Sequence, residues 1–333
     1  MVVSAKDSNA VVLDRIKQSA SMTSDGPLHR LTFRAMSTEC RVHVHGVTAA
    51  LARAFQTEAL HWVAAFEAKY SRFLPDSLIS RINAAAGENW VEVDPDAERI
   101  FNLCQELFFF TQGAFDPTAL PLIQLWNWKS KPARIPEQAV LAGARQLVGW
   151  SKVRRRSGGI FLPQRGMSID LGGIGKEYAV DCVMNLAAER GIGNILVDFG
   201  QDLRVRGQAP GKPHWFIGLQ DPARPESCWA GVAVRDHAVA TSGDYLRHTV
   251  IDGKRYGHII DPRSGYPVNN ECRAVSVIAP SCTVAGLFAT TIFILGPKLG
   301  IPMLERYPGA AGAITTDSTR LFTRNFHEYI PQP

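Results

Sequence analysis

Hydrophobic residues recur at helical spacing in several stretches of the chain. Between residues 49 and 66, Leu51, Phe55 and Val63 fall on one face, so we predict a long amphipathic helix there. We predict that a short helix follows the polar loop 71–76 and ends near Asn83. The same spacing predicts further helices over residues 98–111, 136–147, 173–190 and 284–295. Gly113 is placed to end the helix over residues 98–111.

Alternation of apolar and polar residues predicts strands mainly in the second half of the chain. Cys40, Val42 and Val44 form one early alternating stretch. Short strands are expected at residues 160–162 and 167–169, strands then dominate up to Ile278, and a closing pair lies near Ala313 and Leu321. Because helices and strands are partly segregated and partly mixed, the pattern favours an α+β fold over a doubly wound sheet.

Two regions depart from this regular pattern. Residues 1–27 are polar with little apolar periodicity, which predicts a disordered or loosely helical segment ahead of a single domain over residues 28–333. Residues 113–128 are rich in Pro, Gly and aromatic residues, which predicts an ordered loop that lines a site. No apolar signal region and no run of about 18 apolar residues is present, so we expect a soluble, cytoplasmic protein.

Composition narrows the partners of the protein. The 333 residues carry a net charge of +5 and are 46% hydrophobic, as expected for a folded globular protein. This mild positive charge suits an anionic small molecule or an acidic partner, and it is far below that of a nucleic-acid-binding surface. The six cysteines show no zinc-ligand spacing, so we expect reduced thiols and no zinc site.

The stretch from Ser168 to Asp181 joins a predicted strand to a predicted helix through glycines. Glycines at such a junction let backbone N–H groups approach phosphates, and a helix N-terminus favours negative charge. Lys176 lies in the first turn of the helix and could reach the same anion, while Asp170 could bind a ribose, a base or a metal. The alternative is a tight strand–helix turn with a surface lysine.

A second stretch places hydroxyl and carboxylate groups beside a histidine. Thr241 and Ser242 precede a glycine and form a candidate anion-binding turn. His258 lies in the same hairpin-sized segment as Asp244 and Asp261. Two interpretations stay open, since His258 is either a general acid or base or a hydrogen-bonded core histidine.

Two further stretches carry weaker signals. Phe115 and Asp116, next to a proline, could form a rigid wall against a flat ring, or a buried aromatic loop in which Asp116 caps a turn. On the predicted C-terminal helix, Gly286 and Thr290 are four residues apart and share a face. A hydroxyl directed back to the preceding helical turn is the alternative interpretation of Thr290.

In their order along the chain these stretches resemble the ApbE family, the FAD:protein FMN transferases. The resemblance runs from Ala35 to about Leu295. It rests on residues 35–38, 71–73, 113–117, 170–173, 178–181, 241–245 and 258–262, with Ser77, Asn83, Lys176, Gly200 and Asp202. It implies two closely packed α/β lobes with the flavin site between them, FAD as the substrate and Mg²⁺ as the metal.

The resemblance also implies roles for individual residues. His258 matches a histidine that assists transfer, and Gly173 and Thr290 match positions that ligate magnesium. In the family an aromatic residue at the position of Phe73 flanks the isoalloxazine ring. The positions that match FAD contacts in the family are Met36, Phe73, Ala114, Phe115, Asp116, Asp170, Lys176 and Ile260.

Three positions depart from the family pattern. The family helix reads Ala-Asp-Ala-Leu-Ala/Ser-Thr and its Asp ligates the metal, whereas this chain has Gly286 there. Glu177 replaces the glycine after the motif lysine, and Gln201 replaces the second glycine of Gly-Gly-Asp. A hard cation prefers anionic oxygens, so we expect weaker magnesium binding and a gain in affinity from Gly286→Asp. Either Glu177 or the FAD phosphates could compensate.

The reaction that the resemblance implies is metal-assisted cleavage of FAD, with FMN passing to a Thr or Ser on a flexible segment of a partner flavoprotein and AMP leaving. His258, with Asp244 or Asp261, would take the proton of the acceptor hydroxyl. Two alternatives stay open. One is an FAD-binding protein without transfer, which Gly286 favours, and the other is an FAD pyrophosphatase that releases FMN and AMP.

Overall fold

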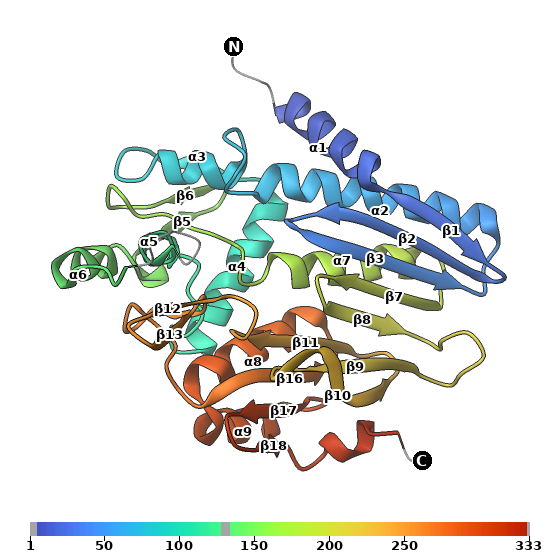
Figure 1. The fold of residues 1–333 in the computed structure, drawn as a ribbon. Helices are drawn as coiled ribbons and strands as arrows, with labels where there is room; N and C mark the ends of the chain where they lie inside the picture. The colour runs from blue at the N-terminus through green and yellow to red at the C-terminus, as the bar shows by residue number, and fades with distance from the viewer. Residues whose placement is uncertain (1–4, 128–133, 332–333) are drawn as a thin grey trace.

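The computed structural model describes residues 5–127 and 134–331, and within them the largest element is a nine-stranded antiparallel sheet. It runs across the molecule from the N-terminal strands to the C-terminal ones (Figure 1). In spatial order its strands are β1 (Ser21–Asp25), β2 (Leu28–Ala35), β3 (Thr38–His45), β7 (Asn194–Phe199), β8 (Asp202–Arg206), β11 (Ala238–Gly243), β16 (Cys272–Ala279), β17 (Ala311–Thr316) and β18 (Arg320–Phe322).

Four helices pack on one face of this sheet. They are α1 (Ala5–Ser19), α2 (Ala49–Tyr70), α7 (Gly175–Glu189) and α8 (Cys282–Leu295). The β9–β10 hairpin (Trp215–Asp221 and Arg224–Val234) covers part of the other face. Successive side chains of a strand contribute to opposite cores. On β7, Val197 is buried on the helical side whereas Leu196 packs against the core under the hairpin.

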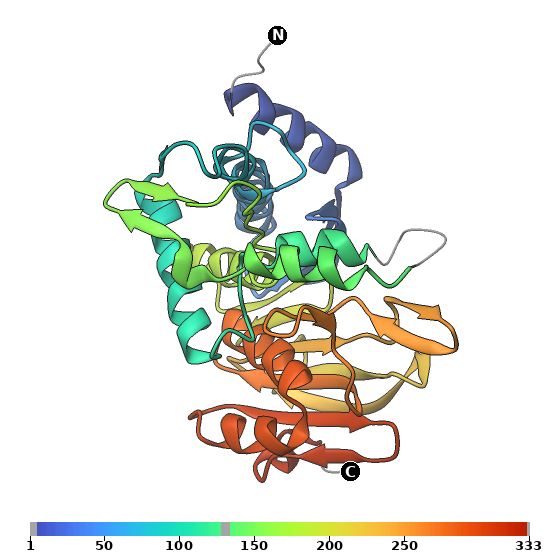
Figure 2. The same cartoon turned by 90° about the vertical axis from the view of Figure 1, so that its left-hand side faces the viewer.

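Shorter elements cluster beyond one end of the sheet (Figure 2). The helices among them are α3 (Leu78–Ala84), α4 (Pro95–Phe110), α5 (Leu120–Trp126) and α6 (Gln138–Gln146). The strands are β4 (Val91–Glu92), β5 (Arg154–Arg156), β6 (Gly159–Phe161), β12 (His248–Ile251), β13 (Lys254–Gly257), β14 (Ile260–Asp261) and β15 (Tyr266–Pro267). A small core of Leu122, Trp126, Leu141, Val148 and Ile260 joins α5 and α6 to β14.

The predicted helices are confirmed, with small shifts at their ends, because each has local signals. Thr48 caps α2, Asp94 caps α4 and Ser281 caps α8, each through a side-chain oxygen that accepts a backbone N–H. The helix predicted from residue 173 begins at Gly175. The early strand is β3, and the closing strand pair is β17 and β18.

Two predictions of local structure are wrong, and one helix was not predicted. Residues 167–169 form no strand, because the backbone of Ile169 bonds to the side chain of Asn83 instead of to a neighbouring strand. The expected loop 113–128 contains helix α5, while Trp128 lies outside the described residues. The chain also continues after α8 into a short helix, α9 (Pro297–Glu305), that the pattern does not predict.

The N-terminal segment is ordered where the structure describes it, and residues 5–19 are helical, in line with the helical rather than the disordered alternative. Helix α1 packs on α2 with Val12 and Ile16 buried, and β1 pairs with β2 along its whole length. Two apolar residues one helical turn apart are a weak periodic signal in the sequence. In the folded protein their burial against α2 is enough to hold α1 in place. That residues 28–333 form one domain stays a prediction. Among the described residues, no helix is long and apolar enough to cross a membrane.

Candidate functional site

Two tight turns lie side by side at one end of the large sheet. Met36 and Ser37 connect β2 to β3 with φ of 49° and 61°, and Gly200 and Gln201 connect β7 to β8 with φ of 69° and 74°. Two central residues with positive φ are the mark of a type I′ hairpin. Since β3 pairs with β7, the two turns are neighbours. A methionine with positive φ is uncommon and marks this turn as a place to look for function.

Helices α1 and α2 hold the Met36 turn in place. The Met36 N–H donates to Glu67 Oε2 at 3.0 Å, and Arg15 of α1 forms an ion pair with the same oxygen at 2.7 Å. The Glu67 side chain is buried. The N-terminal helix is therefore linked through one carboxylate to a predicted flavin-contacting position, which the sequence pattern did not indicate.

The glycine-rich turn before α7 brings several distant motifs together. The side chain of Asn83 bonds to both backbone groups of Ile169, at 2.7 and 3.0 Å, and the Asp170 N–H donates to the Pro117 carbonyl at 2.8 Å. A Cβ on Gly173 would lie 3.2 Å from the Phe115 ring. The absence of a side chain at Gly173 thus lets the 113–117 loop pack directly on the turn.

An exposed aromatic side chain stands next to this turn. Phe73 is 71% exposed, and the Arg72 guanidinium lies 4.1 Å from the centre of its ring. Arg72 Nε in turn donates to Asp170 Oδ2 at 3.1 Å. A large aromatic held in solvent by a neighbouring charge is a surface on which a flat ring can stack.

The first turn of α7 carries a charged cluster. Lys176 Nζ contacts Glu177 Oε1 at 3.2 Å and also forms an ion pair with Asp202, which follows the Gly200 turn. Burial acts to lower the pKa of Lys176, but the carboxylates of Asp202 and Glu177 outweigh it and raise the pKa above its usual value. Lys176 therefore keeps its positive charge at the helix N-terminus, where an anion is also favoured by the helix dipole.

Glu177 fills the place that a side chain at Gly286 would take. A Cβ built on Gly286 would lie 2.6 Å from Glu177 Cγ, so α8 approaches α7 only because this residue is glycine. Glu177 is 7% exposed, and its Oε2 atom has no hydrogen-bond partner within the described part of the chain. Burial raises the pKa of Glu177, while the neighbouring charge of Lys176 acts to lower it. Two of the three departures from the family pattern, Glu177 and Gly286, are thus in contact.

A cluster of hydroxyl groups lies on α8 and the adjacent strands. Ser242 Oγ is 2.8 Å from Thr290 Oγ1, and Thr241 Oγ1 is 2.8 Å from Ser276 Oγ. The structure therefore joins Ser242 to Thr290, one helical turn beyond Gly286. For Thr290 this hydroxyl partner replaces the alternative of a bond back to its own helix.

Asp181, at a position that resembles the family but had no role in the sequence analysis, fixes this geometry. Its carboxylate accepts from the Cys282 and Thr283 N–H groups, each at 2.9 Å, and from Thr283 Oγ1 at 2.7 Å. The Arg204 guanidinium forms an ion pair with the Asp181 carboxylate at 2.9 Å. A residue of α7 therefore caps the N-terminus of α8, which holds the two helices in register.

The third predicted group surrounds His258. Its Nδ1 lies 3.1 Å from the Arg247 carbonyl. A carbonyl only accepts, so Nδ1 carries the hydrogen and the neutral ring has its lone pair on Nε2. Burial, reinforced by the charge of Arg247, lowers the pKa of His258 to about 4. At neutral pH the ring is therefore uncharged and able to accept a proton.

Both carboxylates proposed to assist His258 bind arginine side chains. Asp244 is buried and forms an ion pair with Arg255 of β13. Asp261 binds Arg263 through both carboxylate oxygens, at 2.9 and 2.8 Å. These pairs tie the 244–263 segment together and hold its shape.

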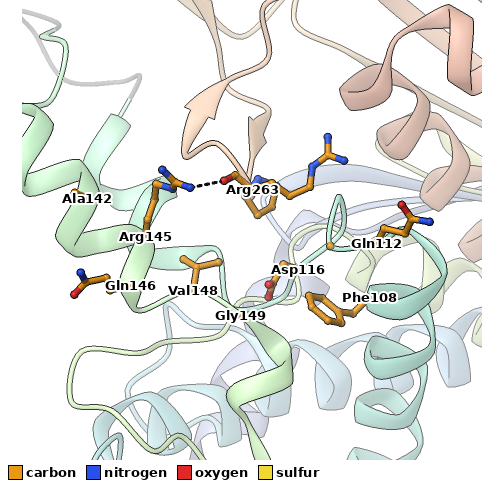
Figure 3. Close-up of a pocket in the computed structure, with 11 residues that line it drawn as sticks. Phe108, Gln112, Asp116, Ala142, Arg145, Gln146, Val148, Gly149 and Arg263 are labelled. Carbon is orange, nitrogen blue, oxygen red and sulfur yellow. Dashed lines mark hydrogen bonds between the residues drawn. The ribbon is translucent and has the colours of Figure 1, made fainter.

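A cavity of about 570 Å³ lies between α4, α6 and the turn after β14 (Figure 3). Asp116 lines it, and two cationic residues, Arg145 and Arg263, stand at its rim, where Arg145 donates to the Arg263 carbonyl at 2.8 Å. The sequence analysis did not single out either arginine, because they lie far apart in the chain and in no motif.

The predicted FAD-contacting residues of the 113–117 loop, and Ile260 with them, are mostly buried. Asp116 accepts from Thr118 N at 2.8 Å, Thr118 Oγ1 at 2.6 Å and Trp150 N at 3.2 Å, which is the turn-capping arrangement offered as its alternative. Ala114 is 2% exposed and Ile260 is 9% exposed. Asp116 thus lines the cavity, whereas the cavity lining does not include Ala114 or Ile260.

The residues around Glu177 fit a hard divalent cation. No group of three or more His, Cys, Asp or Glu side chains is arranged to hold a metal in residues 5–127 and 134–331. A buried carboxylate oxygen without a partner and the hydroxyls of Ser242 and Thr290 are nevertheless oxygen donors of the type that Mg²⁺ prefers. Magnesium commonly takes one or two protein carboxylates and completes its shell with substrate phosphates and water.

The fold and site define an α+β protein with a glycine turn before a helix N-terminus, a solvent-exposed aromatic and a hydroxyl cluster at one end of an antiparallel sheet. This arrangement suits a nucleotide with a flat ring. More particularly, the chain belongs to the ApbE family, whose family model matches residues 36–315.

Relatives of known name agree with this family. The FAD:protein FMN transferase of Treponema pallidum is 32% identical over 294 residues, which cover 82% of this chain and 80% of that protein. The FAD:protein FMN transferase of Klebsiella pneumoniae is 33% identical over 273 residues, covering 80% and 78%. The likeness spans most of both proteins in each case.

Solved structures agree as well. The ApbE protein of Thermotoga maritima superposes with a TM-score of 0.83 at 29% identity, covering 92% of this chain and all of that one. The flavin transferase ApbE of Vibrio cholerae gives a TM-score of 0.81 at 25% identity, covering 93% and 100%. The α+β class expected from the pattern of helices and strands, and the ApbE-like fold expected from the resemblance, are thereby confirmed.

Proposed function

We propose that this protein is an FAD:protein FMN transferase. The observation that carries the proposal is the set of contacts around the glycine turn. On one side Asp170 reaches the exposed Phe73 through Arg72, and on the other Glu177 meets α8 one helical turn before the Ser242–Thr290 pair. In this proposal the flat ring lies beside Phe73, the pyrophosphate lies at the glycine turn, and the metal lies near the Ser242–Thr290 pair.

Binding of FAD is assigned to three kinds of contact. Phe73 and Met36 bind the isoalloxazine ring, because one is an exposed aromatic and the other lies in a fixed turn. The phosphates lie at the N-terminus of α7, near Lys176. Asp170, Thr241 and Ser242 offer polar groups to the nucleotide. Ala114, Phe115, Asp116 and Ile260 are assigned to the FAD contacts that the family pattern implies.

Magnesium would be held by the Gly173 carbonyl and by Thr290. When bound, it would neutralise negative charge that develops on the pyrophosphate. Lys176 contributes a fixed positive charge on the same side of the glycine turn.

His258 acts as the general base in this proposal. Its Nε2 accepts the proton of a Ser or Thr hydroxyl on the acceptor protein, and the hydroxyl oxygen attacks the FMN-side phosphorus. The bond between that phosphorus and the bridging oxygen breaks, and AMP leaves with the bonding electrons. The products are AMP and an acceptor that carries FMN through a phosphoester. Asp244 and Asp261 position His258 by holding its segment through Arg255 and Arg263.

The acceptor is a partner flavoprotein with a flexible segment that contains the reactive Ser or Thr. Such a segment must reach the pyrophosphate from solvent, so an extended peptide suits the site better than a folded surface. The basic hairpin β12–β13, which carries Lys254 and Arg255, lies beside the His258 segment.

The test is to incubate the protein with FAD and Mg²⁺, with and without a flavoprotein acceptor, and to measure AMP by chromatography and covalent flavin by in-gel fluorescence. AMP release that depends on the acceptor, with a fluorescent acceptor band, supports transfer. AMP without acceptor identifies a pyrophosphatase instead. Bound FAD with no AMP under either condition identifies a flavin-binding protein and overturns the proposal.

A further inference from the structure

The strongest unexplained feature of the site is the contact between Glu177 and Gly286. The two residues belong to different helices, and the glutamate side chain occupies the volume that a side chain on α8 would need. The carboxylate is almost fully buried, yet only Oε1 has a partner, Lys176, while Oε2 has none among the described residues. Buried carboxylate oxygens normally accept hydrogen bonds, so an orphaned one calls for a ligand.

We infer that Glu177, reaching across from α7 to Gly286, supplies the carboxylate that holds the divalent cation of this site. The inference rests on the proposed function, because it concerns the metal of the same reaction. Glu177 and Gly286 act as a compensating pair, in which the acidic ligand has moved from one helix to the facing one. The Glu177 carboxylate extends from α7 into the space that a side chain at position 286 of α8 would occupy.

Three observations support this assignment. Gly286 lies one helical turn before Thr290, so a carboxylate above Gly286 lies on the helix face that carries the hydroxyl donor. Asp181 ties the N-terminus of α8 to α7, which fixes the relative position of Glu177 and that face. Apart from Glu177, the acidic side chain in contact with Lys176 is Asp202, and its carboxylate already forms an ion pair with the lysine.

The same contact revises the expectation for Gly286→Asp. The new Cβ would lie 2.6 Å from Glu177 Cγ, a distance that forces the glutamate or the helix to move. It would also place two carboxylates together in a buried space. The single substitution is therefore expected to lower stability rather than to strengthen metal binding, whereas removing Glu177 at the same time relieves the clash.

The test measures Mn²⁺ binding by electron paramagnetic resonance, with the full-length protein saturated with FAD and no acceptor present. Glu177→Gln keeps the size of the side chain and its contact with Lys176 while removing the charge. We expect it to raise the Mn²⁺ Kd at least about tenfold. Asp202→Asn is the matched control, because it removes one charge from the other partner of Lys176, and its Mn²⁺ Kd should stay within about threefold of the wild type.

The double variant Glu177→Gly with Gly286→Asp provides the second arm. It moves the carboxylate back to α8 and should recover a Mn²⁺ Kd within about threefold of the wild type, while Gly286→Asp alone should show a lower Tm without tighter binding. Unchanged Mn²⁺ affinity in Glu177→Gln overturns the inference. Equal losses in Glu177→Gln and Asp202→Asn do so too, because they show that Glu177 acts through Lys176.

The outcome is independent of whether the protein transfers FMN. Metal binding to the FAD complex is measured by resonance, whereas the proposed function is decided by acceptor-dependent AMP. A wild-type protein that binds Mn²⁺ through Glu177 but releases no AMP retains the inference and loses the function. The reverse result retains the function and removes Glu177 from the metal site.

Discussion

Two carboxylates near the site, the half-buried Asp116 and the buried Glu177, have opposite surroundings. Asp116, in the 113–117 loop, accepts three hydrogen bonds from Thr118 and Trp150. Glu177, at the start of α7, leaves one buried oxygen without any partner in the described chain. A carboxylate whose oxygens are satisfied by its own fold maintains architecture, whereas one with an unsatisfied oxygen is available to a ligand. The comparison therefore assigns a structural role to Asp116 and a ligand-binding role to Glu177.

The same division extends to the residues around each carboxylate. On the Asp116 side, Ala114 is buried and Ile260 packs in a small apolar core with Leu122 and Trp126. On the Glu177 side lie Lys176 and the hydroxyls of Ser242 and Thr290. Substitutions near Asp116 should therefore change the stability of the fold. Substitutions near Glu177, or of the proposed general base His258, should change metal binding or the rate of transfer.

The largest effect is expected from His258→Asn. Loss of the general base should lower the rate of FMN transfer by about 10²–10⁴-fold, with little change in Tm. Single-turnover AMP release measures the rate, and fluorescence titration measures FAD affinity. A rate within a few-fold of the wild type would show that another group accepts the proton.

The pH dependence of the same histidine follows from its low pKa. Because His258 has a pKa of about 4 in the folded protein, it stays neutral as pH falls from 7 to 5, and transfer should persist over that range. In the unfolded chain the ordinary pKa applies, so stability that is present above about 6.5 is lost as pH falls through about 4. NMR titration of the imidazole, assigned with His258→Asn, tests this. A midpoint near 6.5 would contradict it.

The next effect is on stability, at Asp116. Asp116→Ala leaves the Thr118 and Trp150 N–H groups without their acceptor, which should lower the free energy of unfolding by about 2–3 kcal/mol. Urea denaturation measures the loss. The Mn²⁺ Kd of the FAD complex should remain near the wild-type value, in contrast to Glu177→Gln. A large loss of metal binding without a loss of stability would reverse the comparison.

The smallest effect is expected at the N-terminal helix. Arg15 is 53% exposed, so its ion pair with Glu67 is worth less than about 1 kcal/mol, and Arg15→Ala should weaken FAD binding by less than about fivefold. Glu67→Ala also removes the acceptor of the Met36 N–H and should weaken FAD binding more. Flavin fluorescence gives both constants. Equal values for the two variants would show that the Met36 turn does not depend on Glu67.

Local signals in the sequence were sufficient for most of the helices. Capping residues such as Thr48 and Asp94 act within a few residues of the backbone that they bind, so a linear pattern reveals them. Helix α1 and the extended residues 167–169 were different. Burial against α2 stabilises α1, and the side chain of Asn83 takes the hydrogen bonds that a neighbouring strand would have made to Ile169.

The candidate site divides in the same way. Its motifs are visible in the chain because turns that need glycine, and helix starts that bind anions, are encoded by a few adjacent residues. The partners of those motifs are not visible. Arg145 and Arg263 meet at the cavity, and Asp181 caps a helix about a hundred residues further along, through contacts that follow only from the packing of distant elements.

The sequence by itself determined the family, the α+β class and the two departures at positions 177 and 286, since these depend on which residues follow one another. Only the tertiary structure decided that the two departures touch. Side-chain volume and unsatisfied polar atoms are properties of a packed interior, where α7 and α8 compete for the same space. In the sequence Gly286 is a missing metal ligand. In the folded protein its lack of a side chain leaves the space that Glu177 occupies.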